Sequence, residues 1–179
     1  MTGPTPDIVT DMPARSMVKS LFSFPSPVNE YAARIVAGMV VALSLAIILT
    51  GQSWLLFVLA FGFLARVATG PTLSPLGLLA TRVIVPILGN PQRPVPGPPK
   101  RFAQTVGLAF SVTAIAVHFT VGSNLLTMSV VGVLAGFATL ESVFGFCAGC
   151  FVFNQMIRLG LIPESVCREC ALTLQPAAN

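Results

Sequence analysis

The chain has 179 residues, of which 54% are hydrophobic and only 9% are charged, and its mean hydropathy is +0.85. A soluble domain of this length can hardly hide so much apolar surface from water, so we expect an integral membrane protein whose surface faces the lipid bilayer. Ten Lys and Arg against six Asp and Glu give a formal charge of +4, which is too sparse for a polyanion-binding face. We therefore expect no nucleic-acid partner.

The first segment, residues 1–30, is predicted to be a flexible cytoplasmic tail. It does not resemble a cleavable signal, because Asp7 and Asp11 oppose a basic beginning and no short apolar stretch with a small-residue cleavage site follows.

Four apolar runs dominate the segment 31–159, which we predict to be a four-helix membrane domain. The predicted spans are about 31–50, 51–67, 102–121 and 125–146. The last two have the roughly 20 residues needed to cross about 30 Å of hydrocarbon. The first two are shorter, but Arg34 and Arg66 at their ends can extend toward the interface. Short Gly-containing turns join the runs in pairs, so the fold class is all-α, a bundle of two transmembrane hairpins.

The loop between the second and third spans, residues 70–101, contains a further structured piece. Ser74 and Pro75 have the pattern of a helix start, and the apolar stretch 76–88 is too short to cross a membrane. We expect a cytoplasmic interfacial helix there, followed by an extended Pro-rich spacer at 91–99.

Orientation follows from the basic residues. The predicted short turns at 51–53 and 122–124 contain no Lys or Arg, whereas the tail, the central loop and the end of the chain do. The positive-inside rule then predicts a multi-pass protein of the cell (inner or plasma) membrane with both termini in the cytoplasm.

Two isolated charges inside the predicted spans are expected to meet. Arg66 and Glu141 fall at similar heights when the two hairpins are overlaid, and a carboxylate within a membrane usually faces the bundle interior and finds a partner. The pair could fix helix packing, or it could handle protons or a substrate. Gly132 and Gly136 form a GxxxG pattern that predicts close packing against a neighbouring helix.

All four cysteines lie in the last third, as Cys147 and Cys150 and then, after sixteen residues, as Cys167 and Cys170. We expect the fourth span to continue as a helix to about residue 159 and a second short helix to start at Pro163 in the cytoplasmic segment 160–179. The two CxxC pairs would then converge on one site.

Three interpretations of these thiols remain open. They could perform dithiol redox or sulfur-transfer chemistry, bind a structural Zn through four thiolates, or merely fill space. For the redox reading, Arg158 and Arg168 could stabilise a thiolate, although Cys147 does not obviously lie at a helix N-terminus. The sequence is compatible with an enzyme and with a noncatalytic protein.

Several stretches together resemble a known family. They are 28–30 (VNE), 70–77 (GPTLSPLG), 96–104 (PGPPKRFAQ), 140–144 (LESVF) and 147–150 (CAGC). They are similar to bacterial, actinobacterial-type membrane proteins grouped as domain of unknown function 4395. The resemblance implies a four-helix membrane domain without an established activity, and a tendency to accompany thioredoxin-like and sulfurtransferase proteins. The family's CxGC element corresponds to Cys147 and Cys150.

The interpretation that follows is a membrane-embedded thiol module that faces the cytoplasm and exchanges electrons or sulfur with a soluble thioredoxin-like or sulfurtransferase partner. The alternative is a noncatalytic scaffold whose C-terminal hairpin is held by a four-cysteine Zn site.

Overall fold

The computed structural model describes residues 26–71, 73–163, 166–167 and 170. The predicted tail therefore lies almost wholly outside the described residues, as does Arg168. Within the described part the protein is mostly helical, and its only sheet there is a two-stranded one.

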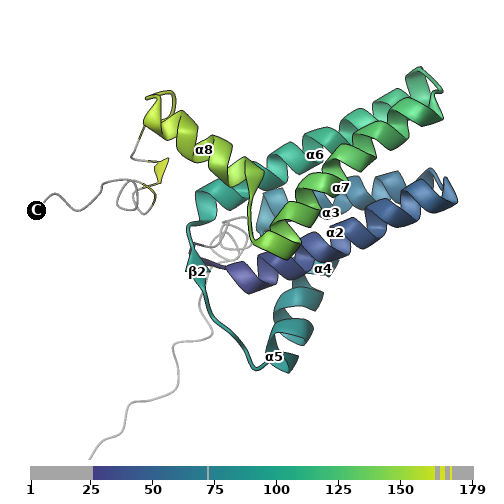
Figure 1. Cartoon of the computed structure of the whole chain (residues 1–179). Coiled ribbons are helices and arrows are strands. Elements are labelled where there is room, and N and C mark those ends of the chain that lie inside the picture. The colour runs from purple at the N-terminus through teal and green to yellow at the C-terminus, as the bar shows by residue number, and fades with distance from the viewer. Residues whose placement is uncertain (1–25, 72, 164–165, 168–169, 171–179) are drawn as a thin grey trace, which may run out of the picture.

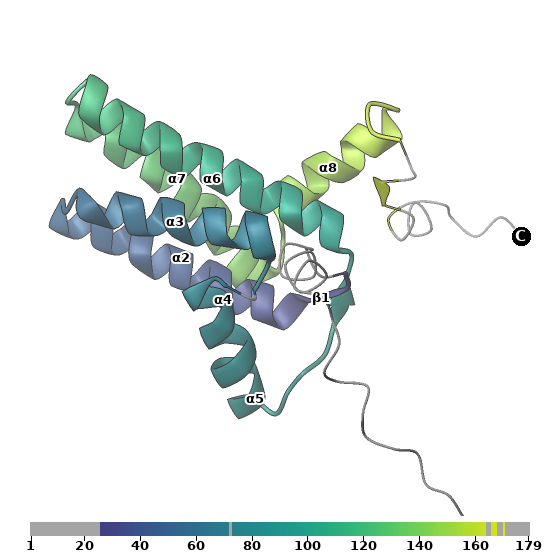
Figure 2. The same cartoon turned by 180° about the vertical axis from the view of Figure 1, so that it is seen from behind.

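The longest helices in this part of the chain are α2 (Glu30–Thr50), α3 (Trp54–Thr69), α6 (Gly97–Thr120) and α7 (Asn124–Phe144). They lie side by side, with α2 against α7 and α3 against α6 (Figures 1 and 2). Their buried apolar side chains form one core between the helices: Val40, Ile47, Leu56, Leu59, Phe63, Ala114, Val131, Leu134 and Ala138. The bounds agree with the predicted spans to within a few residues, except at the start of α6.

Three of these helices, α2, α6 and α7, are long and apolar enough to cross a membrane, whereas α3 is shorter. Large apolar side chains also cover the outside of the bundle, among them Leu49, Phe57, Phe61, Phe119 and Leu125. An outer surface of this kind indicates a membrane protein.

Several hydroxyl side chains within the long helices bond to their own helix, although Ser44 of α2 is buried without a partner among the described residues. Each of the following donates to the carbonyl oxygen four residues earlier, at 2.6–3.0 Å: Thr50, Thr105, Ser111, Thr120, Ser129 and Thr139. These hydroxyls therefore need no partner from a neighbouring helix.

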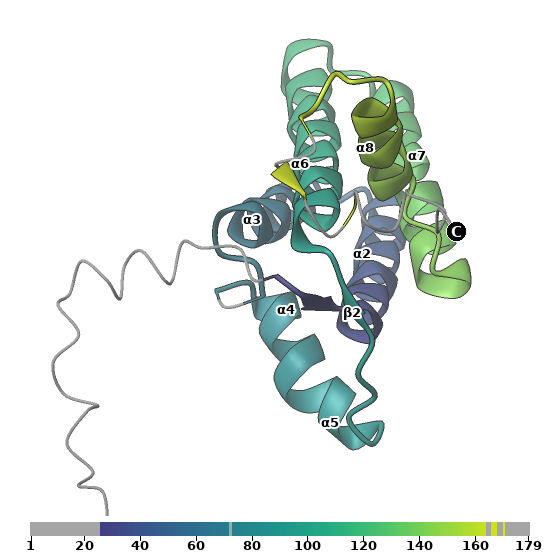
Figure 3. The same ribbon diagram turned by 90° about the vertical axis from the view of Figure 1, so that its left-hand side faces the viewer.

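The central segment is helical where the sequence predicted it. Ser74 accepts a hydrogen bond from Gly77 N and caps α4 (Pro75–Leu79), which continues through the π-helical turn η1 (Ala80–Ile84) into α5 (Val85–Ile87). Pro86 has no N–H to donate to a carbonyl oxygen of the preceding turn. The helix widens into the π-helical turn η1 just before this proline. Figure 3 shows the segment pointing away from the bundle, with α8 on the other side.

The Pro-rich stretch returns to the beginning of α2. Strand β2 (Pro94–Val95) pairs antiparallel with β1 (Val28–Asn29), and Glu30 N donates to Arg93 O at 2.9 Å. An ion pair of 3.0 Å between Arg93 and Glu30 lies beside this contact. The spacer is thus extended over residues 91–96 and pairs with the chain that precedes α2. Residues 97–99, which were also predicted to be extended, instead form the first turn of α6.

Two helix predictions were wrong. The fourth long helix does not continue to residue 159, because Gly145 adopts a left-handed conformation with φ 69° and ends α7 at Phe144. Arg34 donates to the carbonyl oxygens of Ser142 and Val143 at 3.2 and 2.6 Å. These two oxygens in the last turn of α7 therefore have a hydrogen-bond donor although the helix ends there. In addition, a Cβ placed on Gly132 or Gly136 would meet nothing within 4 Å, so the GxxxG pattern contacts no neighbouring helix in the described chain.

Candidate functional site: a CxxC pair at a helix N-terminus

The break after α7 places Cys147 at the start of a new helix. Helix α8 (Ala148–Arg158) begins immediately after it, and Cys147 is the N-cap, with its Sγ accepting a hydrogen bond from Cys150 N at 3.3 Å. The expectation that this cysteine continues an apolar helix was therefore wrong. The N-terminus of a helix favours negative charge, so this is a position that stabilises a thiolate.

Gly149 fixes how closely α8 approaches α6. A Cβ built on it would lie 2.7 Å from both the Cα and the Cβ of Ala103, which is far inside van der Waals contact. Only glycine fits this close approach without displacing one of the two backbones. The middle of the CxGC element thus holds the beginning of α8 against the first turns of α6.

A buried ion pair lies next to the cysteines. Lys100 Nζ and Glu141 Oε1 are 2.6 Å apart, and their side chains are only 9% and 14% exposed. Lys100 and both cysteines line the same pocket. The amine therefore places a positive charge close to the thiols.

The predicted pairing of Glu141 with Arg66 was wrong in its partner. Arg66 Nε donates instead to Gln104 Oε1 at 2.8 Å, and the guanidinium lies over the Phe63 ring with Cζ 4.5 Å from the ring centre. Sequence reasoning missed Lys100 because it assigned that residue to the central loop. The usable signal was the run Pro98-Pro99, which is typical of the first turn of a helix and moves the start of α6 ahead of Lys100.

The pKa values of the two thiols of the first pair are shifted in opposite directions. A hydrogen bond from the Cys150 thiol lowers the pKa of Cys147, and the charge of Lys100 acts in the same direction, against burial and the charge of Glu141. The same hydrogen bond to Cys147, together with burial, raises the pKa of Cys150. Cys147 is therefore the thiol of the pair that ionises more readily.

Arg158, one of the two arginines expected to activate the thiols, does not lie near them, and Arg168 is outside the described residues. Arg158 is exposed in the last turn of α8, eleven residues beyond Cys147 or about 16 Å along the helix axis. A charge at that end of a helix is also too distant to replace the N-terminal dipole at the other end. The cation that lies near the thiols is Lys100, and not Arg158 as predicted.

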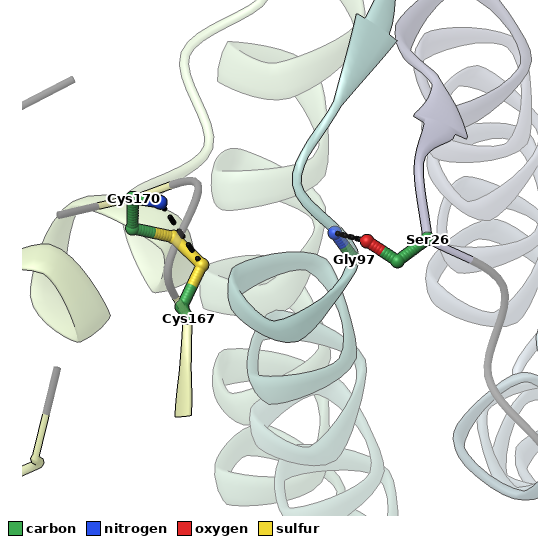
Figure 4. Close-up of a disulfide and its surroundings, with 4 residues drawn as sticks. All are labelled: Ser26, Gly97, Cys167 and Cys170. Carbon is green, nitrogen blue, oxygen red and sulfur yellow. Dashed lines mark hydrogen bonds between the residues drawn. A yellow bond between two sulfur atoms is a disulfide. The ribbon is translucent and has the colours of Figure 1, made fainter. Parts of the chain in front are cut away.

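The second pair is oxidised. Cys167 and Cys170 form a disulfide, and both residues are buried against Phe153 and Ile157 of α8. Figure 4 shows this disulfide beside the beginning of α6, where Gly97 N donates to Ser26 Oγ at 3.3 Å. A link between residues three apart closes a very short loop and stabilises the fold by only about 2 kcal/mol. Its contribution as a structural staple is therefore small.

One pocket of about 420 Å³ brings cysteines of both pairs to a common space. Its lining includes Cys147, Cys150 and Cys170, together with the charged side chains of Glu30, Arg93 and Lys100. Among the described residues, no three His, Cys, Asp or Glu side chains are arranged to hold a metal ion. With Cys167 and Cys170 joined to each other, two of the four thiolates of the predicted Zn site are occupied.

Comparison with known proteins gives a single family. The family model described as "Domain of unknown function (DUF4395)" matches residues 28–158. The chain belongs to this family. The match includes Cys147, Cys150 and the Lys100–Glu141 pair, and it ends before Cys167. No curated protein and no solved structure gives a significant match.

Proposed function

We propose that this DUF4395 protein is a membrane-embedded dithiol module that exchanges electrons or sulfur with a soluble thiol protein on the cytoplasmic side. The observation that carries the proposal is Cys147 at the N-cap of α8, with its sulfur accepting the Cys150 N–H and with Lys100 nearby. A nucleophilic thiol at a helix N-terminus followed by a protonated thiol one turn later is the arrangement that CxxC redox chemistry needs.

The proposed topology has four spans. Helix α3 is shorter than the other three, but Trp54 at its beginning and the turn residues before it can lie at the opposite interface. The turns joining α2 to α3 and α6 to α7 carry no Lys or Arg, while the cysteine site lies at the end of the bundle that holds Arg34, Lys100 and Arg101. The positive-inside rule puts that end in the cytoplasm.

The exchange reaction proceeds in two steps. The Cys147 thiolate attacks one sulfur of a partner disulfide, forming a mixed disulfide and releasing the second partner sulfur as a thiolate that takes a proton. Cys150 then loses its proton and attacks Cys147 Sγ, so that the partner leaves as a dithiol. Two electrons and two protons pass to the partner, and Cys147 and Cys150 end as a disulfide.

The second pair can receive or return the same two electrons. Cys170 shares the pocket with Cys147 and Cys150. Attack of the Cys147 thiolate on Cys170 would release Cys167 as the thiolate, and attack by Cys150 on Cys147 would complete the transfer of two electrons and two protons. A partner persulfide would instead give its outer sulfur to Cys147, and attack by Cys150 would release it as hydrosulfide.

The partner we propose is a thioredoxin-like or sulfurtransferase protein. Its redox loop would approach the cysteine pocket, which is lined by one acidic residue, Glu30, and two basic residues, Arg93 and Lys100. Charges of both signs are suited to contact with a polar protein surface.

Mixed-disulfide trapping with a purified probe tests the proposal. The full chain with Cys167 and Cys170 both changed to Ser, so that the second pair can neither react nor resolve an adduct, is reduced in detergent, freed of reductant, mixed with oxidised thioredoxin and analysed by intact mass. Cys150→Ser should accumulate a one-to-one mixed disulfide, because the resolving thiol is gone, whereas Cys147→Ser should form none. Absence of the adduct with Cys150→Ser, under conditions where a small aromatic disulfide reacts, contradicts thiol exchange.

Metal analysis of the wild-type full chain in detergent tests the alternative clamp. One Zn per chain that is lost on changing any of the four cysteines to Ser would favour the noncatalytic scaffold. A metal-free protein with a titratable dithiol would favour the redox module.

A further inference from the structure

A second cavity lies at the same end of the bundle, between α2, α3, α6 and the α4–η1 segment. It has a volume of about 170 Å³ and a mostly apolar lining. Apolar side chains and small residues form most of its wall: Pro27, Val28, Ala32, Ala33, Val36, Gly70, Pro71 and Gly77. The polar side chains reaching it are Asn29, Arg66, Thr81, Lys100 and Gln104.

Arg66 is the unusual member of this wall. The residue is only 4% exposed, yet its Nη1 and Nη2 have no hydrogen-bond partner, while Nε is bonded to Gln104. A guanidinium carries its donors in a flat fork that matches the two oxygens of a carboxylate. Buried donors without acceptors destabilise a structure, so this fork is expected to have an acceptor when the cavity is occupied.

The charges nearby point to an anion. Arg66 contributes +1, and the Lys100–Glu141 ion pair contributes +1 and −1, which leaves +1 for the three residues together. The cavity wall includes Arg66 and Lys100 but no carboxylate among the described residues. An uncompensated buried cation is costly, and a ligand anion would remove that cost.

We infer that this cavity binds a small organic anion, with a carboxylate held by Arg66 and an apolar body packed between α2 and the α4–η1 segment. The size supports a body of about one six-membered ring, since an apolar cavity of about 150 Å³ takes up benzene. Inorganic anions such as sulfate lack the apolar body and are expected to bind more weakly. The inference does not rest on the proposed thiol chemistry, although Lys100 lines both this cavity and the cysteine pocket.

Equilibrium dialysis of labelled benzoate against the detergent-solubilised full chain tests this inference, with a detergent-only chamber as the blank. Benzoate should bind saturably with one site per chain, and benzyl alcohol and sulfate should each compete at least about tenfold more weakly. Arg66→Gln should lower benzoate affinity by at least about tenfold, because the charge-assisted fork is lost. Arg82→Gln is the matched control, because Arg82 is exposed on η1 and does not line the cavity.

A second variant covers the possibility that Arg66→Gln fails to fold. Ala33→Phe leaves the guanidinium in place but fills the apolar part of the cavity, so it should also abolish benzoate binding. The inference is overturned if wild-type protein shows no saturable benzoate binding, if benzyl alcohol competes as well as benzoate, or if a folded Arg66→Gln protein keeps the wild-type affinity.

Discussion

At the scale of single residues, the difference between two thiols three positions apart decides the chemistry. Cys147 and Cys150 have similar burial, but one caps a helix and accepts hydrogen bonds while the other donates. In the proposed exchange, this asymmetry gives attack on a partner to Cys147 and release of the partner to Cys150.

The first prediction concerns the pH dependence of Cys147 alkylation. Because its pKa is lowered, the reactive thiolate should persist to a lower pH than the roughly 8.5 midpoint of a free cysteine. Cys150→Ala removes the hydrogen-bonding thiol and should move the midpoint of the iodoacetamide rate profile to higher pH. Cys150→Ser retains a donor and should shift the midpoint less. Identical profiles for the two variants would show that the Cys150 side chain does not tune Cys147.

A second prediction concerns the buried ion pair. Lys100→Met leaves Glu141 buried without its cation and should lower the free energy of unfolding by about 3 to 5 kcal/mol. Adding Glu141→Gln to this variant should restore part of the loss, which a double-mutant cycle in detergent measures. The matched control is Arg93→Met, because Arg93 is 66% exposed in its pair with Glu30 and should cost no more than about 1 kcal/mol. Additive effects of Lys100→Met and Glu141→Gln would contradict the pairing.

At the scale of elements, the position of α8 on α6 depends on one glycine. Gly149→Ala puts a methyl group 2.7 Å from Ala103 Cα, and we predict a loss of about 1 to 3 kcal/mol from the resulting overpacking. The alkylation rate of Cys147 should change as well, because the helix that it caps is displaced.

Gly132→Ala is the control for this substitution. Gly132 also lies in a helix, but a Cβ there meets nothing within 4 Å. The added methyl should be neutral or should stabilise the helix by up to about 1 kcal/mol. Equal losses for both alanine variants would mean that the close approach to Ala103 is not what matters at Gly149.

Apolar runs predicted the long helices well, since length and hydropathy are local properties of the sequence. The end of α7 was missed because Phe144, Phe146 and the following cysteine keep the segment apolar, and hydropathy does not report the left-handed conformation of Gly145. The partner of Glu141 was missed for a different reason. Lys100 was assigned to the central loop, which left Arg66 as the cation considered, and only the packing of α6 against α7 determines which of the two reaches the carboxylate.

At the scale of the whole molecule, the cysteine pocket and the Arg66 cavity lie at the same end of the bundle. The cysteine pocket and the Arg66 cavity both adjoin Lys100, while the turns 51–53 and 121–123 lie at the other end of the long helices.

The topology prediction follows from this polarity. A reporter fused after Asn179 and one inserted near Pro96 should both be cytoplasmic, whereas one inserted at Gly122 should be on the opposite side. Paired reporters of alkaline phosphatase and green fluorescent protein at each site provide the measurement. An external reporter at either Asn179 or Pro96 would contradict the four-span model and the cytoplasmic position of the thiols.

The hydroxyl groups that bond within their own helices also have a consequence for biogenesis. A helix entering hydrocarbon must satisfy its polar groups without water, and Thr50, Ser111, Thr120, Ser129 and Thr139 already do so through carbonyls one turn earlier. None of these five side chains needs a hydrogen-bond partner from a neighbouring helix when it leaves water. In the proposed topology these five hydroxyls therefore set no order for the entry of the helices, whereas Lys100 of α6 and Glu141 of α7 can satisfy each other only once both helices are in place.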